Sequence, residues 1–218
     1  MKFRKRVTAS VLTAALLCGS AGSSVPVYGA PAGADVDETM YVNLDYYGKT
    51  TKVNVVKGVN LNGLGEITDY GNYTKVENMS TSDEPVLGDG SVTWNLPEDQ
   101  TGRFYYKCTM DNDQVVLPWD FDVSYKLNGV QADGDKLAGA SGLIEINIKA
   151  TPNDNASLYY RNNMVLMVTV PVDMSKCYSI DADGAQIQSL GSTTAAVFSA
   201  LPGEEGDYTV RIGTDSFE

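Results

Sequence analysis

The stretch LPWDFDVSYKLNGVQADGDKLAGASGLIEINIKA, residues 117–150, decides the fold class of this chain. Apolar and polar residues alternate over 119–127, and the same two-residue period returns over 143–150. A period of two is typical of a β-strand that buries one face and leaves the other in water. The sequence therefore predicts two amphipathic strands, joined by a turn at Asn128-Gly129 and a polar loop.

The same alternation recurs on both sides of this stretch. It is present at 40–46, 53–55, 92–96, 104–110 and 208–212. Gly, Pro, Asn and Asp residues separate these runs, as expected of turns. No segment longer than about ten residues has a clean helical period. The pattern predicts an all-β protein.

The order of the runs predicts how the strands pair. Residues 41–56 predict a hairpin with a Gly48 turn, and residues 92–110 predict a second hairpin. The nearly continuous apolar run 164–172 predicts a central strand buried on both faces. We expect a hairpin-rich N-terminal β region at 35–115 and an immunoglobulin-like β-sandwich at 116–218.

The N-terminus predicts export. Four basic residues precede an apolar run at 7–18, and small residues follow it, so residues 1–34 have the three parts of a secretory signal peptide. Their removal leaves 12 basic (16 − 4) and 28 acidic residues, a net charge of −16. Such a surface repels nucleic acid. We expect a secreted or cell-surface protein with no membrane span in the mature chain.

The absence of histidine restricts the chemistry. It excludes Ser-His-Asp and Cys-His catalysis as usually built, and zinc sites of the common His/Cys kind. The turn Asp181-Ala182-Asp183-Gly184 resembles the start of a calcium loop, but Leu190 stands where the bidentate Glu is needed, so a plain turn is favoured. No carboxylate pair lies in a context that marks a cleft. We predict no enzyme activity, no cofactor and no metal site.

Tyrosines and lysines supply the candidate binding residues. Tyr46 and Tyr47 lie near Lys49 and Lys52 at the tip of the first predicted hairpin, and aromatic area beside positive charge is common at interfaces. We predict that this hairpin is an exposed strand edge that docks a partner. Tyr46-Tyr47 and a second pair, Tyr159-Tyr160, are candidate stacking platforms. Alternatively, strand alternation places one tyrosine of each pair in the core.

Two cysteines remain after the signal peptide, Cys108 and Cys177. An even number in an exported chain allows a disulfide. Buried free cysteines also pack well as small hydrophobic groups. Both interpretations remain open on the sequence.

Several segments resemble one family. Residues 123–130 (VSYKLNGV), 136–142 (KLAGASG) and 143–148 (LIEINI), with 38–44 (ETMYVNL) and 200–203 (ALPG), resemble extracytoplasmic regions of Gram-positive, clostridia-type envelope proteins of the phage-infection-protein family. The chain departs from that pattern at Ala140, where Lys is usual, and it lacks the family's heptad repeats and a membrane segment after Phe217. If residue 218 is the true end, the resemblance implies a secreted version of such a surface protein; if the chain is a fragment, the anchor is missing. It supplies no catalytic residues.

We therefore predict a non-enzymatic interaction or scaffold module of a Gram-positive envelope, with an envelope protein or a cell-wall glycan as its partner. A carbohydrate-binding module that uses the tyrosines is the alternative. Glycan binding that is lost when Tyr46 or Tyr159 is changed distinguishes the second function from the first.

Overall fold

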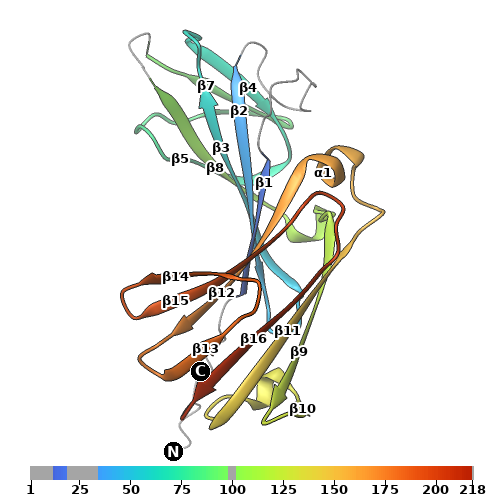
Figure 1. The fold of residues 1–218 in the computed structure, drawn as a ribbon. Helices are drawn as coiled ribbons and strands as arrows, with labels where there is room; N and C mark the ends of the chain where they lie inside the picture. Colours follow the sequence, from blue (N-terminus) through green and yellow to red (C-terminus); the bar gives the residue numbers. More distant parts are fainter. Residues whose placement is uncertain (1–11, 19–33, 98–101, 218) are drawn as a thin grey trace, which may run out of the picture. The chain divides into compact units, whose positions relative to one another are not determined.

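The protein is all-β (Figure 1). A computed structural model describes residues 34–97 and 102–217, together with the backbone of β1 (Leu12–Cys18). The rest of the predicted signal peptide, 1–34, lies outside the described residues apart from residue 34. The described part contains no helix that is long and apolar enough to cross a membrane.

The described chain divides into two compact units. Unit 1 consists of residues 42–51 and the chain from 116 onward, and unit 2 contains residues 34–41 and 52–115. The change at 115/116 coincides with the predicted domain boundary. The turn of the first hairpin, however, belongs with unit 1, because β2 (Asp35–Leu44) and β3 (Thr50–Asn60) continue through both units.

Unit 1 is built around the stretch that the sequence singled out. Its five-stranded sheet has the order β10-β9-β11-β16-β13. The bounds are β9 Trp119–Leu127, β10 Val130–Ala132, β11 Gly142–Pro152, β13 Cys177–Asp181 and β16 Gly206–Thr214. β9 and β11 pair antiparallel, with Val123 opposite Ile148, so the two amphipathic strands are confirmed. The loop between them is structured, and it contains β10 and the 3-10 turn Gly134–Lys136.

A second layer of unit 1 contains β12 (Met164–Asp173), β14 (Gln186–Leu190) and β15 (Thr193–Ala200), in the order β14-β15-β12. The ring of Phe198 stacks on that of Tyr208 of β16, with centroids 4.6 Å apart. The expectation that residues 164–172 are buried on both faces is wrong. Burial alternates along β12, which is typical of one core face and one partly solvated face.

Unit 2 also has two sheets. One contains β2, β3, β8 (Arg103–Met110) and β5 (Tyr73–Asn78) in that order, and the other has the order β4-β7-β6. The bounds of the second sheet are β4 Glu66–Tyr70, β6 Val86–Gly88 and β7 Ser91–Asn95. The ring of Trp94 lies 5.0 Å from Phe104 and 5.3 Å from Tyr106, which joins the two layers through an aromatic core.

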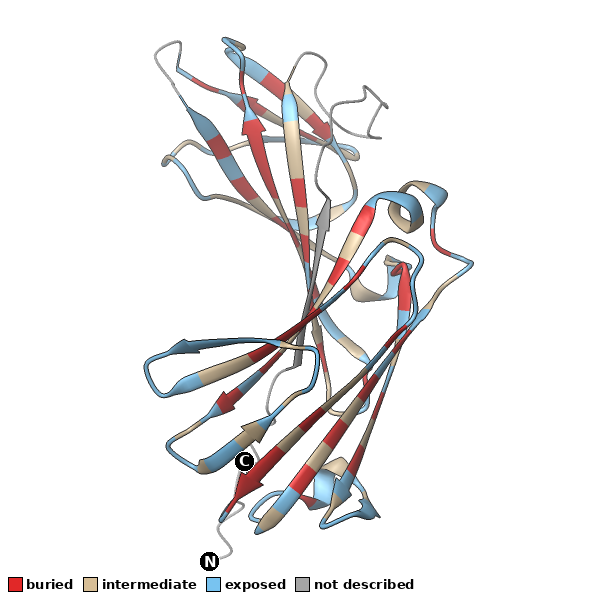
Figure 2. Ribbon diagram, viewed as in Figure 1, coloured by how far each residue is buried: buried red, intermediate tan, exposed pale blue. Residues whose placement is uncertain are grey.

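The predicted second hairpin, 92–110, is therefore wrong. Strand β7 pairs with β4 and β6, whereas β8 pairs with β3 and β5. The first hairpin is confirmed, because β2 and β3 are neighbours in one sheet. Figure 2 shows the buried positions alternating along the strands of both units. The immunoglobulin-like arrangement of residues 116–218 stays a prediction.

Candidate functional site

The tip of the first hairpin packs within unit 1. The Tyr47 hydroxyl donates to Asp135 Oδ1 at 3.2 Å, and Tyr46 and Tyr47 meet edge to face with ring centroids 4.8 Å apart. A Cβ at Gly48, whose φ is +89°, would lie 2.5 Å from the carbonyl oxygen of Phe121. Only glycine fits this close approach without a shift in the backbone. The tip is therefore held against β9 and the loop that follows it.

The β3 side of the hairpin is not a free strand edge. β3 pairs with β8 from Val53 to Asn60, and in the strand order β2 lies between β1 and β3. The prediction of a free edge for strand addition is therefore wrong for β3; for β2 it stays a prediction, because β1 lies within the predicted signal peptide. Lys49 and Lys52 are exposed, whereas Tyr46 is partly buried.

The second tyrosine pair lies on a helix. Tyr159 and Tyr160 belong to α1 (Leu158–Asn163), which begins where the Ser157 hydroxyl accepts from the Tyr160 amide. Alternation along a strand therefore does not apply to them. Their rings meet edge to face with centroids 5.5 Å apart, and both are partly buried. Neither tyrosine pair forms a flat, coplanar surface for stacking.

Both cysteines of the described chain are free thiols. Cys108 lies in the core of unit 2 on β8, and Cys177 begins β13 of unit 1. Burial raises the pKa of the Cys108 thiol to about 12, so the reactive thiolate is scarce at neutral pH.

The most unusual side chains of the molecule form a charged cluster inside unit 2. Glu38 of β2 is 8% exposed, Lys57 of β3 is 4% exposed, and Asp69 of β4 is fully buried. Each occupies an inward position of its strand: Glu38 is in series with Met40, and Lys57 with Val55. Two of the three come from one sheet and Asp69 comes from the facing sheet.

Short contacts connect this cluster. Lys57 Nζ donates to Asp69 Oδ1 at 2.8 Å and lies 3.6 Å from Glu38 Oε2. The other oxygen of Asp69, Oδ2, accepts from the hydroxyls of Tyr106 at 3.0 Å and Tyr73 at 3.2 Å. Lys57 Nζ also lies 5.7 Å from the centroid of the Tyr73 ring. Asp69 is thus held by three donors, two on one oxygen and one on the other.

The electrostatics follow from burial. Burial raises the pKa of the Glu38 carboxyl, and nearby Lys57 only partly offsets this. Burial alone would lower the pKa of the Lys57 ammonium, but the Glu38 and Asp69 carboxylates outweigh it and the pKa is raised. Burial likewise raises the pKa of the Tyr106 and Tyr73 hydroxyls, which keeps both as hydrogen-bond donors.

Two further features were considered as candidate sites: possible metal ligands and a surface pocket. Among the residues that the structure describes, no three His, Cys, Asp or Glu side chains are grouped to hold a metal ion. A pocket of about 300 Å³ in unit 2 is lined by Asn72, Asp111 and Gln114 beside the Tyr73 ring. It is open and largely polar.

Among the described edge strands of unit 1, β14 is the one that is exposed along its whole length. Strand β14 pairs with β15 on one side and ends the strand order on the other. All five of its residues are exposed, and none is charged. Its two large apolar side chains, Ile187 and Leu190, are 51% and 86% exposed. An uncharged, exposed edge is what natural sheets usually avoid, unless it binds another strand.

Neither the charged cluster nor the β14 edge was predicted from the sequence. The signal for the cluster was present: Val53, Val55 and Val59 set an inward period of two, and Lys57 falls on it. The signal for the edge was the uncharged pattern QIQSL at 186–190, which follows an Asp-Gly turn.

The fold and site define an all-β protein of two sheet-built units, one of which encloses a Lys-Asp-Glu cluster. Comparison with known proteins found no matching family model, no similar curated protein and no similar solved structure. The resemblance to envelope proteins of the phage-infection-protein family therefore stays a prediction, supported by the quoted segments alone.

Proposed function

We propose that the chain is a non-enzymatic interaction or scaffold module, exported to the surface of a Gram-positive cell envelope and related to the phage-infection-protein family. The signal-peptide pattern of residues 1–34 and the acidic mature chain support export and a contact that does not depend on anionic polymers. The β14 edge carries the proposal for binding. Its partner is an extended segment of an envelope protein.

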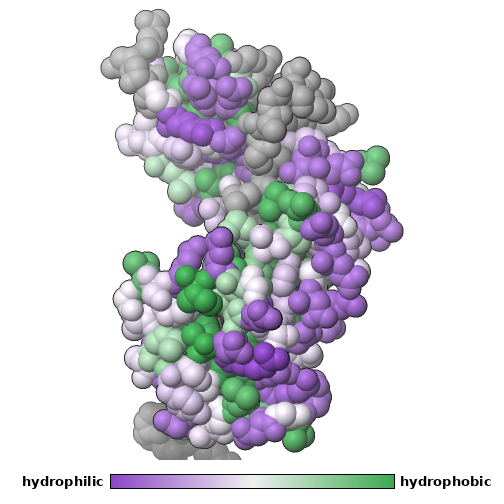
Figure 3. Space-filling view, viewed as in Figure 1, coloured by the Kyte–Doolittle hydropathy of each residue, from purple (hydrophilic) through white to green (hydrophobic). Residues whose placement is uncertain are grey.

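Strand addition explains the composition of β14. A partner strand satisfies the free backbone groups of the edge and covers the alternate side chains on either face. Ile187 and Leu190 then lose contact with water, and burial of an apolar side chain is worth roughly 1.5–3 kcal/mol. Figure 3 shows apolar surface at the β14–β15 hairpin. The absence of Lys, Glu, Asp and Pro from 186–190 leaves the edge without the usual barriers to pairing.

The test replaces Ile187 and Leu190 by Lys and measures retention of the purified protein on isolated cell envelopes. Loss of about 1.5 kcal/mol or more weakens binding roughly tenfold. The matched control replaces Leu158 and Leu201, which are 69% and 60% exposed but lie away from β14, by Lys. Equal retention of both variants and the parent would overturn the β14 edge as the docking site.

Carbohydrate binding is the alternative function. The polar pocket beside Tyr73 favours it, because its amide and carboxylate groups match sugar hydroxyls. The edge-to-face packing of Tyr46-Tyr47 and Tyr159-Tyr160 does not. Glycan-array binding that survives the β14 substitutions and is lost in Tyr73→Ala would favour this alternative.

A further inference from the structure

We propose that Lys57 and Asp69 form an intramolecular isopeptide bond, an amide between Lys57 Nζ and Asp69 Cγ, with Glu38 as the acid–base group. The bond would join β3 of one sheet to β4 of the facing sheet inside unit 2. It goes beyond the binding function and does not rest on it.

The geometry is that of a reacting pair. Lys57 Nζ lies 2.8 Å from Asp69 Oδ1, which is directly bonded to the carbon that must be attacked. Both side chains are held by their strands in the core, so the amine and the acid meet without further ordering. Such fixed placement supplies a large part of the barrier lowering in intramolecular reactions.

The reaction needs the uncharged amine and acid, which the pair can reach by a single proton transfer. A buried ion pair loses the hydration that stabilises it in water. When Lys57 passes one proton along its hydrogen bond to Asp69, the result is a neutral amine and a neutral carboxylic acid with no change in total charge. Lys57 and Asp69 are buried from water, which would otherwise favour the ions, and Tyr106, whose hydroxyl donates to Asp69, belongs to the aromatic core with Trp94 and Phe104.

The remaining contacts suit the transition state. The hydroxyls of Tyr73 and Tyr106 both donate to Asp69 Oδ2, where negative charge develops when the nitrogen attacks Cγ. Glu38, 3.6 Å from Lys57 Nζ, lies within reach of the proton that the nitrogen must lose. Burial favours the neutral acid form of Glu38, which can protonate the departing hydroxyl.

The reaction balances without a co-reactant. The C–N bond forms and one C–O bond of Asp69 breaks. Glu38 gives a proton to the leaving oxygen and receives one from the nitrogen. The ammonium and carboxylate together become one amide and one water molecule. No oxidant, reductant or metal takes part.

Mass spectrometry of the full chain tests the proposal. We expect an intact mass lower than the sequence mass by one water molecule. Trypsin cuts after Lys52 and Lys75 and, in an unlinked chain, also after Lys57. A linked chain instead yields the single peptide 53–75, short of one water and uncut at Lys57. Full mass together with cleavage at Lys57 would overturn the proposal and leave a buried ion pair.

Two variants separate the bond from other losses of water. Lys57→Arg keeps the positive charge and the tryptic site but has no primary amine, so we expect full mass and cleavage at residue 57. Loss of water in this variant would point to dehydration of an aspartate alone and would contradict the bond. Glu38→Gln should leave most chains unlinked; complete linkage in this variant would overturn the role of Glu38. These masses are readable whether or not a variant folds fully.

Discussion

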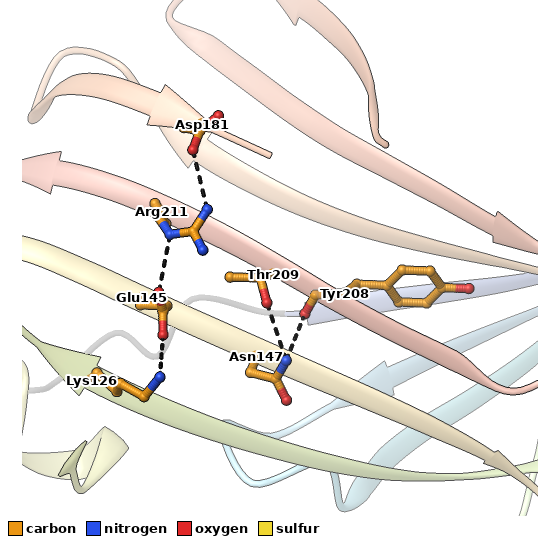
Figure 4. Close-up of polar contacts among 7 residues, drawn as sticks. All are labelled: Lys126, Glu145, Asn147, Asp181, Tyr208, Thr209 and Arg211. Atoms are coloured by element: carbon orange, nitrogen blue, oxygen red, sulfur yellow. Dashed lines mark hydrogen bonds and ion pairs between the residues drawn. The ribbon is translucent and has the colours of Figure 1, made fainter. Parts of the chain in front are cut away.

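Unit 1 and unit 2 place charged side chains in opposite ways. In unit 1 a row of charges crosses the solvent side of the five-stranded sheet (Figure 4). Glu145 Oε1 lies 2.6 Å from Lys126 Nζ and its Oε2 lies 3.0 Å from Arg211 Nε, while Arg211 also contacts Asp181 at 3.3 Å. In unit 2 the Lys57 cluster lies inside, between the sheets.

The difference shows how environment sets the energetic weight of the same residue types. Water screens the row in unit 1, so each of its ion pairs contributes little. Inside unit 2 no water replaces a missing partner, and each charge depends on the others. Substitution of a few buried polar residues is therefore expected to destabilise unit 2 strongly, whereas the stability of unit 1 should depend mainly on its apolar core.

Lys57→Ala should have the largest effect. It leaves Glu38 and Asp69 buried without a cation, and the breaking of a buried pair is expected to lower the free energy of unfolding of unit 2 by about 3–5 kcal/mol. The chain has two tryptophans, Trp94 in unit 2 and Trp119 in unit 1. Urea unfolding followed by fluorescence in W119F and W94F backgrounds reports the two units separately.

The matched control for Lys57→Ala is Lys126→Ala, which removes a lysine from the exposed row. It should change the Trp119 transition by less than about 1 kcal/mol. Equal effects of the two substitutions on their own units would contradict the comparison.

A change of pH should alter the stability contributions of the two glutamates, Glu38 in unit 2 and Glu145 in unit 1, in opposite directions. Burial raises the pKa of Glu38 above its ordinary 4.5, so the folded state holds this proton to higher pH than the unfolded chain. The contribution of Glu38 to stability is full below pH 4.5 and is lost as pH rises through the folded-state pKa. Glu38→Gln has no carboxyl group to titrate at this position, so among chains without the Lys57–Asp69 amide the difference in stability between Glu38→Gln and the parent in the Trp94 transition should shift in favour of Glu38→Gln as pH rises.

Glu145 should behave in the opposite way. Its hydrogen bond from Lys126, helped by that from Arg211, lowers its pKa below 4.5. Its contribution is present above pH 4.5 and is lost as pH falls through the folded-state value. The difference between the parent and Glu145→Gln in the Trp119 transition should therefore shrink in acid. If the stability contributions of Glu38 and Glu145 changed with pH in the same direction, the buried setting of one and the exposed setting of the other would be contradicted.

The alternation of apolar and polar residues predicted well where strands lie, but it predicted poorly which strands pair with one another. The period of two gave the faces of 119–127 and 143–150, and their closeness in sequence also gave their pairing. For 92–96 and 104–110 the same argument failed, because alternation tells which face is buried and not which sheet a strand joins. Helix α1 escaped detection because six residues are too few to show a helical period.

The sequence alone does not reveal the candidate site, because a charged residue in a strand is normally a sign of exposure. Lys, Glu and Asp are rarely buried unless they are paired, and the partners of Lys57 lie 19 and 12 residues away, at Glu38 and Asp69. Sequence patterns show that Lys57 falls on an inward position, but only the facing sheet shows what neutralises it. Aromatic composition likewise does not reveal that both tyrosine pairs pack edge to face.

Arg211→Ala should have the smallest effect of the substitutions considered. Arg211 contacts both Glu145 and Asp181, yet its side chain is 41% exposed and water can replace either contact. We expect a loss of less than about 1 kcal/mol in the Trp119 transition, and a smaller loss at high salt because exposed charges are screened. A loss of several kcal/mol that salt does not change would mean that the row behaves like the buried cluster, and the contrast between the two units would then fail.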